Sequence, residues 1–335
     1  MDSVLTIRDL KTHFFLDEGI VRAVDGVDLE IPRGKTIGIV GESGCGKSVT
    51  AFSSLRLVAE PGKIVSGDII LHQKTGDVVL TALEDEGDLI RAIRGKEIAM
   101  IFQEPMTSLS PVHTVGFQIV EAIELHTELQ GEKADAHAVH MLDRVGIPDP
   151  ARRFAQYPHE LSGGMRQRVM IAMALSCQPA LLIADEPTTA LDVTIQAQIL
   201  DLMRDLQIEF DMSIMLITHD LGVVAEVADE VAVMYMGRIV EQASTEEIFE
   251  NPKHPYTRAL MQSIPGMGAG RKTRLKTIKG SVPDPFSQLN GCPFHPRCED
   301  AKKGICDVGN RPELISLESD HQVACVLYQG EVTRG

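Results

Sequence analysis

The chain is poor in aromatic residues and in positive charge. It contains no Trp, only 4% of its residues are aromatic, and its 32 Lys and Arg face 48 Asp and Glu, a formal net charge of −16. This excess of acid argues against a broad grip on a nucleic-acid backbone and against general adhesion to anionic lipid. No run of 18 apolar residues occurs, and no basic segment with an apolar core opens the chain, so we expect a cytosolic protein without a membrane span.

Cysteines are scarce until the end of the chain. Cys45 and Cys177 stand alone, whereas four crowd the C-terminal part: Cys292, Cys298, Cys306 and Cys325. In a reducing cytosol such a group is expected to hold a metal rather than disulfides. The group follows a Gly-rich stretch and a basic segment over 271–279, so we place a domain boundary near residue 265.

The hydrophobic pattern alternates between short apolar runs and helical stretches. Runs over 36–40, 180–184 and 213–218 are typical of buried strands, and helices are predicted over 49–58 and 194–209. Alternation of this kind predicts an α/β fold with a mainly parallel sheet and helices on its faces.

Two further regions differ from this alternation. The opening of the chain predicts strands over 4–10 and 21–31, which the turn at 32–34 ends. The middle, about 105–178, has few strand signals and carries amphipathic stretches over 115–126 and 132–145. We therefore expect a helical insertion there.

The segment GESGCGKS at residues 41–48 satisfies the phosphate-loop pattern, with a predicted buried strand before it and a helix after it. Its glycines let backbone N–H groups turn toward phosphate oxygens, with the helix N-terminus behind them. Lys47 is expected to bridge the β- and γ-phosphates, and the Ser48 hydroxyl to bind Mg²⁺. A Gly-rich turn with a coincidental lysine is the alternative, and the flanking strand and helix argue against it.

The apolar run LLIA at 181–184 ends in two carboxylates, Asp185 and Glu186. Alone, such a run is most often a strand that enters a loop. About 140 residues after a phosphate loop, it predicts that Asp185 holds Mg²⁺ and that Glu186 polarises the attacking water.

A third element, LSGGMRQR at 161–168, places a Ser-Gly-Gly turn at the start of a predicted helix, where free N–H groups can meet an anion. At this point residues 1 to about 260 closely resemble the ATP-binding subunit of ATP-binding-cassette (ABC) transporters, with five or six motifs in the family's order and spacing. The fold that the resemblance implies is a P-loop ATPase with a RecA-like, mostly parallel sheet, an antiparallel β subdomain, an α-helical subdomain and a Cys-rich C-terminal extension. The corresponding domains are an ATPase domain over 1–264 and the extension over 265–335.

The resemblance also implies a role for each motif residue. Glu186 matches the catalytic glutamate, Gln103 the glutamine that touches Mg²⁺ and water, and His219 the histidine that contacts the γ-phosphate. Met165 and Thr189 depart mildly from the family's Gln and Ser. The Mg²⁺ ligands are expected to be Ser48, Gln103 and Asp185. The ATP contacts are expected at Phe14 (or Phe15), Gly41, Ser43, Gly44, Cys45, Gly46, Lys47, Ser48 and Val49, and at Ser162, Gly163, Gly164 and Asp192.

The flanks indicate the branch of the family. The segments at 22–26, 104–109, 146–150 and 251–257, together with the Cys-rich tail, resemble the dipeptide/oligopeptide importers. This implies a second homologous ATPase subunit, two membrane permease subunits, an extracytoplasmic solute-binding protein and a peripheral position on the cytoplasmic face of the cell membrane. The cargo is most simply di- or oligopeptides; oligosaccharides or nickel are the alternatives.

The four clustered cysteines have the spacing C-x5-C-x7-C-x18-C, without the paired knuckles of structural zinc sites. Four thiolates on irregular loops suit a [4Fe–4S] cluster, and the resemblance points the same way, because some members carry one in this tail. His295 and His321 leave zinc open, and absence of any metal is the third alternative.

Soluble ABC ATPases are the rival class of function. DNA-repair or chromosome-structuring members would need long heptad coiled coils between Ser48 and Leu161, and none is present. Tandem-cassette translation factors would need a second phosphate loop, and an iron–sulfur assembly subunit would not need the importer-like tail. We therefore expect an ATPase that is coupled to transport.

Overall fold

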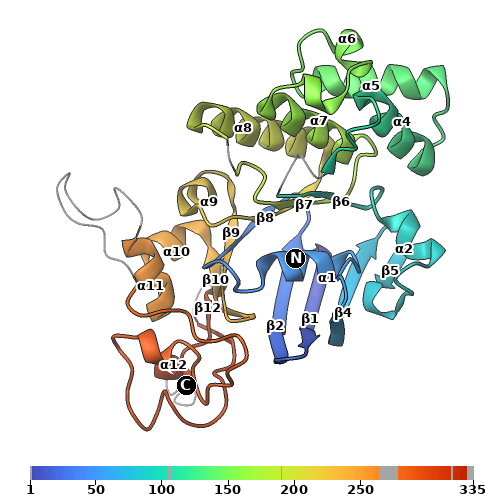
Figure 1. Cartoon of the computed structure of the whole chain (residues 1–335). Coiled ribbons are helices and arrows are strands. Elements are labelled where there is room, and N and C mark those ends of the chain that lie inside the picture. The colour runs from blue at the N-terminus through green and yellow to red at the C-terminus, as the bar shows by residue number, and fades with distance from the viewer. Residues whose placement is uncertain (1, 104–107, 190, 264–277, 318–319, 330–335) are drawn as a thin grey trace. The chain divides into compact units, whose positions relative to one another are not determined.

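The computed structural model describes residues 2–103, 108–189, 191–263, 278–317 and 320–329 (Figure 1). The chain divides into two compact units. The first contains residues 1–4, 31–35 and 83–216, and the second contains residues 5–30, 36–82 and 217–335. Among the described helices, none is long and apolar enough to cross a membrane.

The first unit combines three neighbouring strands with a group of helices. Its strands follow the order β8-β7-β6, and β6 and β7 run parallel with Ile98 opposite Leu181. The strands are β6 (Ile98–Ile101), β7 (Leu181–Asp185) and β8 (Ser213–Ile217), whose last residue is counted with the second unit. The helices are α2 (Asp88–Ile93), α4 (Val115–His126), α5 (Glu132–Arg144), α6 (Pro150–Phe154), α7 (Gly163–Leu175), α8 (Val193–Phe210) and a 3₁₀ turn (Pro158–Glu160).

The helices α4 to α7 pack against one another (Figure 1). In α4 the side chain of Thr114 caps the first turn by accepting from the Phe117 N–H, and Ile119 and Ile123, four positions apart, are fully buried. The helices expected over 115–126 and 132–145 are thus confirmed, because their apolar residues recur at the spacing of one helical face.

The second unit contains two sheets. One is a four-stranded sheet of order β2-β1-β4-β5, in which β4 runs antiparallel to β1 and to β5. The other has the order β11-β12-β10-β9-β3 in this unit, and only its pair β3 and β9 is parallel. The strands are β1 (Ser3–Leu16), β2 (Gly19–Pro32), β3 (Thr36–Val40), β4 (Gly62–Gln73), β5 (Gly76–Val79), β9 (Glu230–Tyr235), β10 (Arg238–Ser244), β11 (Ile315–Ser316) and β12 (Gln322–Val323).

Short helices connect and flank these strands. They are α1 (Lys47–Ser54), α9 (Leu221–Val227), α10 (Thr245–Glu250), α11 (Pro255–Gln262) and α12 (Val326–Gln329), with 3₁₀ turns at Leu80–Ala82 and His295–Arg297. Helix α1 ends four residues before the expected position 58, because Arg56 adopts the left-handed φ of 54°.

The second unit's main sheet is less parallel than expected. Met236 and Gly237 join β9 to β10 as a two-residue hairpin in which both residues have positive φ, 45° and 77°. Such a turn can only connect antiparallel strands, whereas a parallel pair needs a long crossover. The structure combines parallel and antiparallel strands with helices, which confirms the predicted α/β class.

The C-terminal residues complete the second unit's sheet and core. Strand β12 pairs with β10, with Val323 opposite Glu241. Phe294 and Cys292 belong to the same buried cluster as Val231 and Val233 of β9. Strands β11 and β12 therefore belong to the sheet of the second unit, and the segment that contains Cys292 and Phe294 packs into its core. The predicted boundary near residue 265 lies outside the described residues.

Candidate functional site

The phosphate loop, residues 41–48, joins β3 to α1 in the second unit. Gly41 and Gly46 have φ of 155° and 109°, and a Cβ atom on either would lie 2.2 Å from a backbone carbonyl oxygen, of Met234 and Ala23 respectively. Only glycine fits such positions. The Gly237 N–H donates to the Cys45 carbonyl at 2.9 Å, so the turn between β9 and β10 holds the middle of the loop.

The side chain of Lys47 is hydrogen-bonded to the backbone of this loop. Its side-chain Nζ donates to the carbonyl oxygens of Gly41 and Glu42 at 2.8 and 3.1 Å, and the residue is only 6% exposed. Burial raises the pKa of the neighbouring Cys45 thiol against the opposing charge of Lys47, so this cysteine is a neutral, small side chain. The cradle of glycines, a helix start and an ammonium group fits a polyphosphate.

Phe14 and Phe15 of β1, the two residues expected to contact ATP through an aromatic ring, differ in their surroundings. The ring of Phe14 lies against Gly62, where a Cβ atom would approach it to 2.6 Å, whereas Phe15 is 46% exposed. The expected contact of Phe14 or Phe15 with ATP stays a prediction, and Phe15 has the more accessible ring.

The acidic end of β7 brings three predicted motif residues together in the first unit. Glu186 follows the buried Asp185, which is 2% exposed, and adopts a left-handed φ of 47°. Its Oε2 accepts hydrogen bonds from Gln103 Nε2 at 3.0 Å and from Thr189 Oγ1 at 2.8 Å. The expected glutamine and glutamate thus lie side by side. Thr189, noted in the sequence only as a departure from Ser, proves to be a direct partner of this carboxylate.

The expected Mg²⁺ ligands are oxygen donors of the kind that this hard cation prefers. Asp185 and Gln103 lie in the first unit and Ser48 lies in the second. Their joint coordination of Mg²⁺ stays a prediction.

The Ser-Gly-Gly turn forms the N-terminus of α7. The Ser162 hydroxyl accepts from the Met165 N–H at 3.3 Å, and nothing lies within 4 Å of a Cβ atom built on Gly163. Around Gly164 the space is tighter, with Ile195 Cγ2 at 3.2 Å. The start of this 13-residue helix is therefore accessible to an anionic partner.

Two further predicted residues stand at helix starts. Asp192 caps α8 by accepting from the Ile195 N–H at 2.9 Å. His219 is exposed in the short connection from β8 to α9, next to Asp220, which caps α9 through the Gly222 N–H. The side chain of Asp192 serves here as a helix cap. The expected contacts of Asp192 and His219 with nucleotide stay predictions.

The four clustered cysteines line one small cavity in the second unit: Cys292, Cys298, Cys306 and Cys325. The cavity measures about 10 Å³, room for about one water molecule. Among the described residues, no group of three or more His, Cys, Asp or Glu side chains has an arrangement that holds a metal ion. The expected [4Fe–4S] cluster, with zinc or no metal as the alternatives, stays a prediction. All four are free cysteines, and burial raises the pKa of Cys292, Cys298 and Cys325 to about 11.

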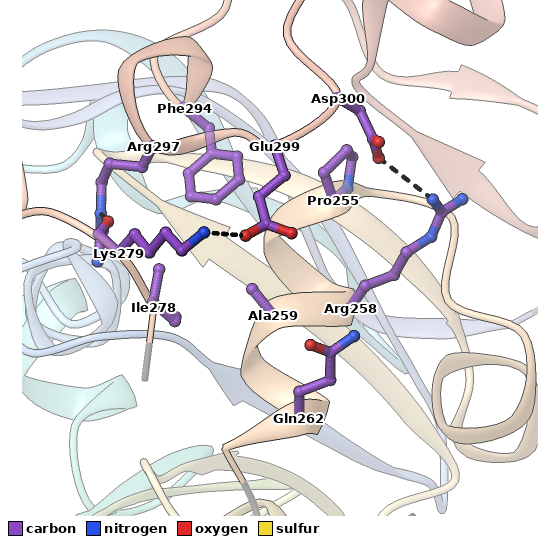
Figure 2. A pocket seen from close by; sticks show the side chains of 10 residues that line it. All are labelled: Pro255, Arg258, Ala259, Gln262, Ile278, Lys279, Phe294, Arg297, Glu299 and Asp300. Carbon is purple, nitrogen blue, oxygen red and sulfur yellow. Dashed lines mark hydrogen bonds and ion pairs between the residues drawn. The ribbon is translucent and has the colours of Figure 1, made fainter. Parts of the chain in front are cut away.

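A larger pocket of about 600 Å³ lies between α11 and the segment around Phe294 (Figure 2). Two ion pairs cross its rim, Lys279 with Glu299 at 2.7 Å and Arg258 with Asp300 at 3.5 Å. None of the predicted catalytic residues lines it.

Comparison with known proteins gives two family matches. Residues 24–189 match the ABC transporter family, and residues 240–306 match the C-terminal region of oligopeptide/dipeptide transporters.

Individual relatives agree with these matches. The chain is 53% identical over 325 residues to a probable peptide ABC transporter ATP-binding protein of Sinorhizobium fredii, covering 97% of this chain and 95% of the relative. It is 51% identical over 332 residues to the oligopeptide transport ATP-binding protein AppD of Bacillus subtilis, covering 99% and 98%. Among solved structures, a dimeric ATP-binding cassette in a post-hydrolysis state with ADP and Pi is similar, with a TM-score of 0.63 and 26% identity, covering 72% of this chain and 98% of the other.

Proposed function

Since the chain belongs to the ATP-binding subunits of ABC transporters and is an ABC ATPase, we propose that it hydrolyses ATP to drive the import of di- or oligopeptides. The observation that carries the hydrolytic assignment is the Glu186 carboxylate, which Gln103 and Thr189 hold directly after the buried Asp185. The proposed cargo rests on the match of residues 240–306 and on the printed names of the relatives.

In the proposed mechanism, Lys47 and the loop N–H groups bind the β- and γ-phosphates, and Glu186 orients and polarises the attacking water. The hydrogen bonds from Gln103 and Thr189 fix the rotamer of Glu186, so this base is oriented before the reaction. His219 contacts the γ-phosphate. Bound Mg²⁺ would neutralise phosphate charge and would be held by Ser48, Asp185 and Gln103.

We further propose that a second, homologous ATPase subunit completes each nucleotide site. The exposed turn of Ser162, Gly163 and Gly164 would face the nucleotide in the partner's phosphate loop, with Asp192 close to it. The open space at Gly163 and the free start of α7 support this role, since helix N-terminal N–H groups attract phosphate. Contacts that form only in the closed dimer would couple closure to ATP.

The remaining proposed partners are two membrane permease subunits and an extracytoplasmic solute-binding protein, with the subunit at the cytoplasmic face of the membrane. We expect the permeases to dock around Gln103 to Leu109, of which residues 104–107 lie outside the described residues. Oligosaccharides and nickel are the alternative cargoes.

The experiment is an uptake assay in a strain that lacks this subunit. Expression of the chain should restore uptake of labelled di- and oligopeptides, whereas Lys47→Ala should not, because it removes the ammonium that binds phosphate. Restored uptake of only oligosaccharide or nickel would overturn the peptide assignment. Equal restoration by Lys47→Ala would overturn the ATP-dependent mechanism.

A further inference from the structure

Glu42, the second residue of the phosphate loop, forms an ion pair with the C-terminal part of the chain. Arg297 donates Nη1 and Nη2 to the two carboxylate oxygens of Glu42 at 2.6 and 2.9 Å, a bidentate pair between residues 255 positions apart. The Arg297 side chain is only 4% exposed and that of Glu42 is 27% exposed. Paired, bidentate charges that are shielded from water bind much more strongly than exposed ones.

The backbone of Glu42 is held from the same region. Its N–H donates to Tyr256 Oη at 2.9 Å, and Tyr256, near the start of α11, is fully buried. The carbonyl of Glu42 meanwhile accepts from Lys47 Nζ. Glu42 therefore links the C-terminal residues to the lysine that the phosphates require.

Arg297 is itself fixed in direction. Its Nε donates to the Lys279 carbonyl at 3.1 Å, and its guanidinium lies 5.9 Å from the ring centres of Tyr235 and Phe294. Figure 2 shows Arg297 and Phe294 on the segment that faces α11. Tyr235, Tyr256 and Phe294 pack with ring centres 4.6 to 5.4 Å apart. A guanidinium held by an aromatic cluster therefore meets the Glu42 carboxylate in a fixed orientation.

We propose that Arg297 is a positioning residue for ATP binding: through Glu42 it sets the shape of the phosphate loop and the place of Lys47. The hydrolytic residues do not depend on this contact. Loss of it weakens the binding of nucleotide phosphates, whereas the turnover of a saturated site changes much less.

The test measures MgATP affinity on the full-length chain with a fluorescent ATP analogue, and kcat and KM on the assembled transporter. Arg297→Gln and Glu42→Gln should each raise the Kd and the KM for ATP about 10-fold, with kcat within about twofold. The double variant should be no worse than either single variant, because both remove the same contact. Arg297→Lys, which keeps the charge but loses the bidentate geometry, should recover only part of the affinity.

Arg311→Gln is the matched control. Arg311 also ties the C-terminal region to the sheet, through Asp25 at 2.8 Å with both side chains 17% exposed, but its side chain pairs with a residue of β2 and not of the phosphate loop. It should lower the melting temperature about as much as Arg297→Gln and leave the Kd for ATP unchanged. If both arginine variants shift Kd equally, or if neither does, the proposal is wrong. Should Arg297→Gln not fold, a normal Kd in Glu42→Gln would overturn it.

The inference rests on the proposed role of Lys47, and Lys47→Ala separates the two. If Lys47→Ala loses ATP binding while Glu42→Gln and Arg297→Gln retain it, only the positioning role fails. If Lys47→Ala binds ATP normally, the proposed nucleotide site itself fails.

Discussion

Replacement of Glu186 by Gln tests the hydrolytic assignment with the least structural disturbance. The two side chains have the same size, and a Gln amide can still offer an oxygen to the donors on Gln103 and Thr189, now 3.0 and 2.8 Å from the carboxylate. The change removes a negative charge and a base and keeps the packing. We therefore expect folding and ATP binding to survive.

The magnitude follows from the lost general base. A positioned base contributes about 100- to 10,000-fold to a rate, or about 3 to 5 kcal/mol of barrier at 1.36 kcal/mol for each factor of ten. Glu186→Gln should lower kcat of the assembled transporter by that factor, with the Kd for MgATP within about threefold. Because ATP is bound but not cleaved, the closed dimer should accumulate.

The assay is phosphate release from the transporter at saturating ATP, with nucleotide binding measured separately. Thr189 supplies a matched pair of controls. Thr189→Ser keeps the hydroxyl that donates to Glu186 and should stay near wild-type rates, whereas Thr189→Val should lose about 10-fold, the effect of one hydrogen bond to a charged group. An assembled Glu186→Gln transporter with turnover within threefold of the wild type would refute the assignment.

Three further predictions concern the Ser-Gly-Gly turn and the C-terminal region. Gly163→Asp has room in the isolated subunit, since nothing lies within 4 Å of a Cβ atom at this position. ATP binding by the isolated subunit should therefore be unchanged, while the ATPase activity of the transporter falls more than 10-fold. Faster hydrolysis by isolated monomers than by the transporter would contradict the composite site. Burial lowers the pKa of His254 to about 4, below its ordinary 6.5, so its neutral form stabilises the fold above pH 6.5 and that stability is lost as the pH falls toward 4. In urea unfolding, the contribution of His254 to the free energy of unfolding should be about 2 kcal/mol smaller at pH 5 than at pH 7. His254→Asn keeps an acceptor for the Tyr256 N–H and should remove this pH dependence. An unchanged pH profile in that variant would disprove the prediction. With pKa values near 11, the thiols of Cys292, Cys298 and Cys325 should resist iodoacetamide at pH 8 in the folded chain and react once urea unfolds it. Alkylation of the folded chain as fast as of the unfolded chain would contradict this prediction.

Much of the fold was predictable because its information is local. The apolar run at 36–40 coincides with β3 (Thr36–Val40), and the helix predicted over 194–209 differs from α8 by one residue at each end. Residue spacing within a strand or helix decides which face is buried, and the sequence displays that spacing directly. Lys47 and Glu186 were predictable for the same reason, since each lies in a short segment whose chemistry its own residues specify, whereas the role of Gln103 followed only from the resemblance to the ABC family.

The tertiary structure decided what depends on residues far apart in the chain. The pairing of Arg297 with Glu42 spans 255 positions, and no local pattern in either segment predicts it. The tertiary structure also brings the four clustered cysteines to one cavity, which their spacing in the sequence alone does not specify. By itself the sequence determined the nucleotide chemistry, because phosphate-binding motifs are local. Only the packing of the C-terminal residues onto β9, β10 and the phosphate loop decided which side chains hold that loop in place, because such contacts depend on distances that no linear spacing specifies.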